Sequence, residues 1–204
     1  RRCLETAEAR DDLGLRVIAH FYLGHAYQDL GELPRAIEEY GRIIALLEGT
    51  HETERFGLSG LPYSGSCAYA AECWIRLGDL PRALGLLDRG ERAANAANHL
   101  YSQMVLAIQR GRVLRELGRL DKAIALLEAT ASLCREKKFI GQTMGALTSL
   151  GETYALVGRP LDGVPLAKEA IRLQEEANAF AGRASMVAAL AGLYLDAGQL
   201  EPLL

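Results

Sequence analysis

Residues 23–40 read LGHAYQDLGELPRAIEEY, and this stretch decides the fold because its pattern returns along the chain. A small residue stands seven positions before a glycine and a large residue stands four before it. Five positions after the glycine stand Ala36, Ala83, Ala123 and Gly163, and nine positions after it stand Tyr40, Leu87, Leu127 and Ala167. The glycines that anchor the pattern are Gly31, Gly78, Gly118, Gly158 and Gly198. Their last three intervals are all 40 residues, which indicates a stack of repeats.

Each repeat predicts a helical hairpin. Apolar residues before each glycine recur at spacings of three and four, as in an amphipathic helix, and the glycine suits the left-handed conformation that ends a helix. The small residue would let a large side chain of the next helix approach closely. We therefore predict hairpins over about 14–48, 64–97, 99–137 and 140–178, and the first helix of a fifth over 180–197. Asp11, Asn98, Lys138 and Asn178 stand twenty residues before a repeat glycine, where a second helix must end.

The unit resembles the tetratricopeptide repeat, whose pattern is W-x2-L-G-x2-Y followed by A-x3-F. The match is clearest in residues 23–27, 36–40 and 150–154. The period of 40 residues departs from the usual 34, and Arg110 stands where the other repeats have an apolar residue. The resemblance implies an all-α, right-handed α-solenoid of helical hairpins that extends over residues 1–204 as one domain.

The resemblance also implies a binding surface. In this family the first helices line a concave groove, and the positions thirteen, ten, six, three and two residues before the glycine face into it. The candidate binding residues at these offsets are Phe21, His25, Gln28, Glu72, Arg76, Ile108, Arg112, Arg115, Thr148 and Glu152, and Gly65 and Val105 hold the outermost offset.

Three arginines of this set suggest the chemistry of the partner. Arg76, Arg112 and Arg115 could each hold a carboxylate with two hydrogen bonds, which favours an acidic peptide. The alternative is that these arginines pair with glutamates along the groove, and surface pairs of that kind contribute only about 0 to 1 kcal/mol.

Composition excludes several classes of function. The chain has 204 residues, of which 50% are hydrophobic and 24% charged, and its formal charge is −3, so nothing indicates a nucleic-acid or acidic-membrane partner. No apolar run is long enough to span a membrane. The four cysteines lack the C-x2-C spacing of a zinc site, and we expect them to be reduced, apolar residues of a cytoplasmic protein.

Motifs that carry catalysis are also missing from the sequence. It contains no phosphate-binding loop, no dinucleotide fingerprint and no nucleophile elbow. His51 and Glu52 begin like a zinc-protease helix, but the second histidine of that motif is replaced by Arg55. We therefore expect no enzyme activity, no cofactor and no metal in this chain.

Two segments depart from the repeat. The interval between Gly31 and Gly78 is 47 residues, and the surplus lies in a loop over 49–63 whose residues Phe56, Leu58, Leu61 and Tyr63 are too apolar for a solvated loop. We expect this loop to fold back on the hairpins, either as a packed connection or as a contact site. Pro165 lies where the other second helices are already formed, so we predict that this helix starts about one turn late.

A second resemblance concerns the parent protein. Residues 46–49, 54–62, 126–128 and 133–136 resemble the C-terminal tetratricopeptide region of bacterial multidomain proteins that join a class III adenylate/guanylate cyclase to an ATPase. Both ends of the chain fall inside repeats, so we expect a fragment of a larger bacterial signalling protein. The leading hypothesis is a non-catalytic regulatory module that binds a partner peptide or another domain of its own chain. The alternatives are a contribution to cyclase turnover and self-assembly, for example as a homodimer.

Overall fold

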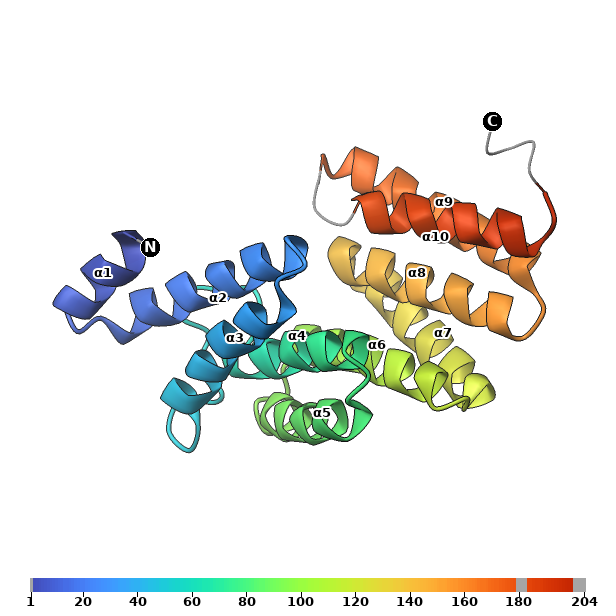
Figure 1. Cartoon of the computed structure of the whole chain (residues 1–204). Coiled ribbons are helices and arrows are strands. Elements are labelled where there is room, and N and C mark those ends of the chain that lie inside the picture. Colours follow the sequence, from blue (N-terminus) through green and yellow to red (C-terminus); the bar gives the residue numbers. More distant parts are fainter. Residues whose placement is uncertain (1, 179–182, 200–204) are drawn as a thin grey trace. The chain divides into compact units, whose positions relative to one another are not determined.

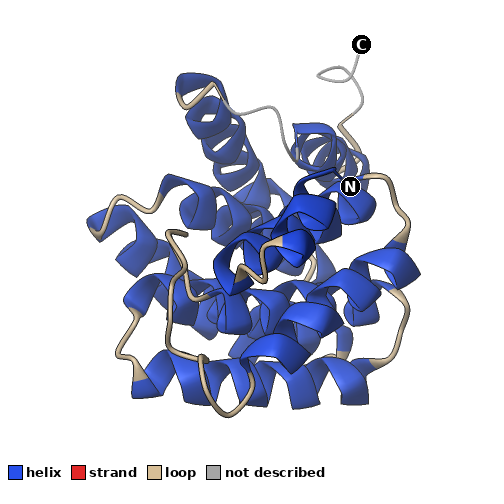
Figure 2. Cartoon of the chain, turned by 90° about the vertical axis from the view of Figure 1, so that its left-hand side faces the viewer, coloured by secondary structure: helices blue, strands red, loops and turns tan. Residues whose placement is uncertain are grey.

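The chain is all-α, as predicted (Figure 1). The computed structural model describes residues 2–178 and 183–199, and these residues form helices and loops without a strand (Figure 2). The helices are α1 (Arg2–Ala9), α2 (Leu13–Asp29), α3 (Leu33–Leu47), α4 (Pro62–Arg76), α5 (Leu80–Ala96), α6 (Leu100–Glu116), α7 (Leu120–Glu136), α8 (Ile140–Leu156), α9 (Pro160–Glu176) and α10 (Arg183–Asp196).

The chain divides into two compact units, residues 1–109 and 110–204, and the boundary falls inside α6. In unit 1, α2 packs on α3 and α4 packs on α5. In unit 2, α8 packs on both α7 and α9, and α10 packs on α9. The continuity of one solenoid over residues 1–204 stays a prediction.

Left-handed residues end the helices at the predicted places. Gly31, Gly78, Gly118, Gly158 and Gly198 have φ values of 76°, 80°, 69°, 76° and 68°. The predicted ends of the second helices behave in the same way, since Asp11, Asn98, Lys138 and Asn178 have φ values of 49°, 47°, 57° and 49°. Helices α2 to α9 are each 15 or 17 residues long.

The two helices of a hairpin approach closely where the sequence has its small residue. A Cβ atom added to Gly24 of α2 would lie 2.6 Å from the Tyr40 ring of α3, and one added to Gly111 would lie 2.6 Å from Leu127. In the fourth hairpin the contact is between backbones, because a Cβ on Gly163 would lie 2.8 Å from the Gly151 oxygen. The predicted packing of a large residue against a small one is confirmed at Gly24 and Gly111.

The prediction for Pro165 was wrong. Helix α9 begins at Pro160 and continues through Pro165 without a delayed start. Pro160 takes the first turn, where a missing N–H costs nothing. The Arg159 guanidinium donates to Asp162 at 2.6 Å, and Gly163 lies against Gly151, so contacts of the first turn offset the hydrogen bond that Pro165 cannot make.

The last predicted helix is found in part. Helix α10 spans Arg183–Asp196 within the predicted range of 180–197, and residues 180–182 lie outside the described residues.

Two glycine substitutions in unit 1 should have opposite effects on stability. Gly24→Ala should lower the free energy of unfolding by about 1 to 3 kcal/mol, because the new methyl group overlaps the Tyr40 ring. Gly41→Ala, in an equally helical but open position, should raise it by about 0.5 to 1 kcal/mol. Urea unfolding followed by circular dichroism measures both, and equal shifts would contradict the close approach at Gly24.

Candidate functional site

Neighbouring first helices within a unit meet with a constant stagger. In unit 1 the His25 ring of α2 lies 4.4 Å from the Tyr69 ring of α4, and Gln109 Nε2 of α6 donates to Glu72 Oε2 of α4 at 2.9 Å. In unit 2, Arg112 Nε donates to Ser149 Oγ of α8 at 2.9 Å. In each case a residue six before one repeat glycine meets a residue nine before the next.

This stagger brings predicted groove residues of unit 1 together around one hollow. Its volume is about 260 Å³. Phe21 and His25 reach it from α2, Gly65 from α4 and Val105 from α6, and all four stand at predicted inward positions. Residues that complete the lining are Tyr22, Leu58, Ser59, Gly60, Leu61, Pro62, Tyr69, Tyr101 and Ser102. We call this hollow the aromatic pocket.

Ring contacts give the pocket a rigid wall. The His25 ring lies edge-on to Phe21 and to Tyr69, with centroid separations of 4.6 and 4.4 Å. Tyr40 of α3 stacks on Tyr69 of α4, with a centroid separation of 5.8 Å. Pairs of this kind each contribute about 0.5 to 1.5 kcal/mol beyond the area they bury. The wall therefore belongs to the core of unit 1, whereas Tyr22 at the rim is 61% exposed.

The inserted loop forms the opposite wall. The Leu61 N–H donates to Ser102 Oγ of α6 at 2.9 Å, and a Cβ on Gly60 would lie 3.2 Å from the Tyr101 ring. Arg55 Nε donates to the Leu58 oxygen at 3.0 Å, which fixes the preceding turn. Phe56 packs against the core between α2 and α3. The loop folds back on the hairpins as expected, and its last residues also line the pocket.

Other predicted residues take part in the packing. Gln28 accepts a hydrogen bond from the Tyr40 hydroxyl at 3.0 Å. Ile108 is buried, and the Thr148 hydroxyl donates to the Met144 oxygen within α8 at 2.9 Å. Arg76 is exposed at the end of α4. Because Arg76 belongs to unit 1, and Arg112 and Arg115 to unit 2, the predicted arginine group stays a prediction.

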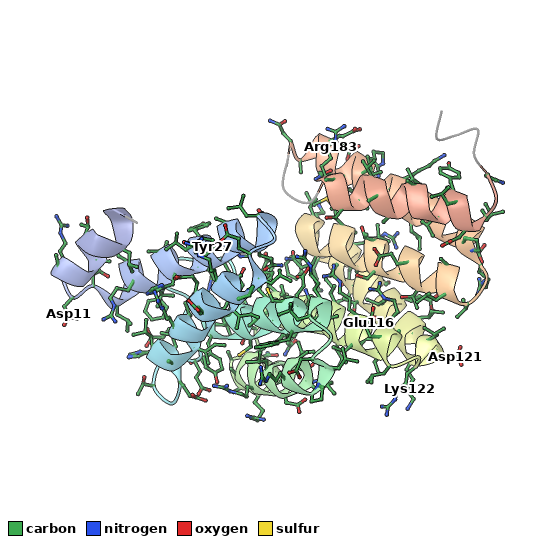
Figure 3. The ribbon with its side chains drawn as sticks, viewed as in Figure 1. Asp11, Tyr27, Glu116, Asp121, Lys122 and Arg183 are labelled. Atoms are coloured by element: carbon green, nitrogen blue, oxygen red, sulfur yellow. The ribbon has the colours of Figure 1, made fainter. Side chains whose placement is uncertain are left out.

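Arg115 makes the ion pairs that the alternative interpretation of the arginines expected. Its guanidinium contacts Glu152 of α8 and also Glu116, which is labelled in Figure 3, at 3.2 Å. The Arg115 side chain is 16% exposed and the Glu152 side chain 40%. An acidic ligand at this place would have to exchange with these two carboxylates.

Arginines stacked on the large residues of the repeat were missed in the sequence. The Arg35 guanidinium lies 4.1 Å from the ring centroid of Tyr27, labelled in Figure 3, and Arg82 lies 4.5 Å from that of Trp74. A cation over an aromatic face contributes about 0.5 to 1 kcal/mol at an exposed site. The signal was present, since Leu-Pro-Arg occurs at 33–35 and again at 80–82. In both places the arginine stands four residues after the repeat glycine, and an aromatic residue stands four before that glycine.

Nothing in the described part of the chain supports metal or thiol chemistry. Residues 2–178 and 183–199 contain no group of three potential metal ligands. Burial raises the pKa of the Cys67 and Cys73 thiols to about 12 and that of Cys134 to about 11, so these thiols stay protonated. His20 is buried, and its Nδ1 lies 2.6 Å from Glu39 Oε2 between α2 and α3. None of the described helices is long and apolar enough to cross a membrane.

Comparisons with known structures agree with this architecture. A kinesin light chain protein of Podosopora anserina with nearly identical TPR-like repeats is 19% identical, with a TM-score of 0.55 over 90% of this chain and 87% of that one. A Rap protein solved in complex with Competence and Sporulation Factor is 16% identical, with a TM-score of 0.74 over 90% of this chain. The chain has the TPR-like repeat fold. It covers 50% of the length of the Rap protein.

The comparisons of sequence gave no match. No protein-family model matches it, and no curated protein is similar to it.

Acid should destabilise unit 1 through His25. Burial lowers the pKa of His25 below its ordinary value of 6.5, and Asp29 and Glu72 oppose this shift only in part. A base with a lowered folded-state pKa binds its proton more readily when unfolded, so stability is complete above about pH 6.5 and falls as the pH drops below it. Unfolding curves between pH 5 and 7.5 should show this slope, and His25→Phe should reduce it. Part of the slope should remain in this variant, because burial also lowers the pKa of His99. An unchanged slope in His25→Phe would contradict the assignment of the pH dependence to His25.

Proposed function

We propose that this chain is a non-catalytic module that binds a partner peptide, or another segment of its parent protein, on the inward faces of its first helices. The observation that carries the proposal is the aromatic pocket, where four predicted groove residues from α2, α4 and α6 line one hollow. A rigid, ring-lined hollow beside exposed helix surface suits a side chain of an extended or helical peptide. The Rap protein of similar fold was solved in complex with Competence and Sporulation Factor, which supports the binding of a partner by this fold.

The acidic partner predicted from the arginines concerns unit 2. Arg112 is bonded to Ser149, and Arg115 is paired with Glu116 and Glu152. An acidic peptide would have to replace these contacts, so its binding free energy would include only the difference between the new contacts and the ones that it displaces. Arg112→Gln with Arg115→Gln should weaken capture of an acidic peptide while leaving the helical content unchanged. Glutamine is the better replacement than glutamate, because a third carboxylate beside Glu116 and Glu152 would destabilise unit 2 through like-charge repulsion. Undiminished capture would remove the arginines from the proposal.

The regulatory role in a bacterial nucleotide cyclase rests on the sequence resemblance alone. In that role, a bound peptide must have different affinities for two states of the parent protein in order to change its activity. Self-assembly is a competing function, and light scattering over a range of concentrations separates it from peptide binding. A dimer that ignores peptides would favour assembly.

Peptide binding should depend on the rim of the aromatic pocket. Peptides selected from a random dodecamer library on the immobilised chain should bind Tyr22→Ala about fivefold or more weakly, because truncation of an interface aromatic commonly costs more than about 1 kcal/mol. Tyr22 is largely exposed, and its ring contact is with Phe21 at a centroid distance of 6.1 Å, so the fold should tolerate the change.

The matched control is Leu30→Ala. Leu30 is also in unit 1 and 71% exposed, but it does not line the pocket. The Leu30→Ala variant should bind the selected peptides with the same affinity as the original chain does. Failure to select any peptide, or equal losses in the two variants, would overturn the proposed function.

A further inference from the structure

The inward faces of α2 and α4 change in character along their length. On α2 the stripe at four-residue spacing runs from Phe21 through His25 to Asp29. On α4 the stripe runs from Gly65 through Tyr69 to Glu72, at spacings of four and three residues. The two helices are parallel, because Phe21 lies over Gly65 and His25 contacts Tyr69. Both stripes therefore pass from an aromatic half to a carboxylate in the same direction.

The size and lining of the aromatic pocket limit what can enter it. Its volume is about 260 Å³. Sites for cofactors and drug-sized ligands are larger, with volumes of about 300 to 1,000 Å³. No Lys, Arg, Asp or Glu lines it, and His25 is its only titratable base. A single large apolar side chain fits such a space, and rings on its wall favour close packing.

The charges beyond the pocket are mainly acidic on the side of α2. Asp29 is exposed, and both Asp29 and Glu72 lie close enough to His25 to act on its protonation. Glu72 is engaged by Gln109, so Asp29 is the carboxylate best placed for a ligand. Arg76 lies one turn beyond Glu72 on this side. Arg55 is tied to the Leu58 oxygen, on the loop side of the pocket.

The spacing between pocket and carboxylate sets the spacing in the ligand. Asp29 follows His25 by four residues, which is about 6 Å along a helix axis. Alternate residues of an extended peptide point to the same side and are about 6.6 Å apart. We infer that the aromatic pocket is the anchor site for an extended peptide with a large apolar residue and, two positions away, a lysine or arginine that pairs with Asp29. This inference rests on the proposed function and names the class of partner.

The test uses the full chain and the dodecamers selected on it. Aligned binders should be enriched in an apolar residue two positions from a basic one, in either chain direction. In the tightest binder, exchange of the apolar residue for alanine should abolish measurable binding. Exchange of the basic residue for glutamate should weaken binding by about two- to fivefold, as expected for an exposed ion pair.

Two charge-reversal variants assign the basic residue to its partner. On Asp29→Lys the glutamate form of the peptide should bind better than the basic form, which reverses the order found on the original chain. On Glu38→Lys, which makes the same change of charge at an exposed site of α3, the original order should remain.

The outcomes separate this inference from the proposed function. Binders that lose affinity on Tyr22→Ala but show no apolar and basic pattern would overturn the inference and leave the proposed function in place. The same conclusion follows if Asp29→Lys and Glu38→Lys have equal effects. If no dodecamer binds, both fail together. A preference for acidic residues beside the apolar anchor would also overturn the inference and would assign the neighbouring charge to Arg76 or Arg55.

Discussion

The close approach of paired helices at a single small residue is the constraint on which the rest of the structure depends. Where α2 meets α3, Gly24 leaves room for the flat ring of Tyr40, and in unit 2 Gly111 does the same for Leu127. Protein interiors are packed to crystal density, so one added methyl group at such a contact must displace a whole ring. Since Tyr40 also stacks on Tyr69, the spacing inside the first hairpin fixes where the next hairpin lies.

Much of the fold could be predicted because the ends of each hairpin's helices depend on single residues close to them in sequence. The left-handed stops at Gly31 and Asn98 follow from one residue and its period, and they were placed correctly. Pro165 was misjudged because the cost of a proline inside a helix is local, whereas the contacts that offset it come from Gly151 on another helix. Local rules find where helices end, and they fail where a distant partner stabilises an exception.

The site was predicted less completely because the sequence does not show how first helices are staggered. Positions such as Phe21 and His25 were identified through the family pattern, but Tyr69, nine residues before its glycine, was not. The contacts of His25, Glu72 and Arg112 share one stagger, so a single known pair would have predicted the others. The apolar residues of the inserted loop predicted that it folds back on the hairpins, but they did not predict where, since the bond from Leu61 to Ser102 joins residues 41 positions apart in sequence.

The same stagger accommodates different chemistry at equivalent positions of the repeats. In three repeats the residue six positions before the glycine contacts the next first helix, ring to ring at His25, carboxylate to amide at Glu72 and guanidinium to hydroxyl at Arg112. In the fourth repeat Glu152 holds this position and pairs with Arg115 of the preceding first helix. The three contacts differ in chemistry but join the same two positions of neighbouring first helices. The aromatic pocket lies beside this series of contacts, where Gly65 lies under Phe21 and Gly60 of the loop lies against Tyr101. The proposed recognition therefore uses a place where a glycine and the inserted loop depart from the repeat, whereas the inward side chains of the three contacts named above hold neighbouring helices together.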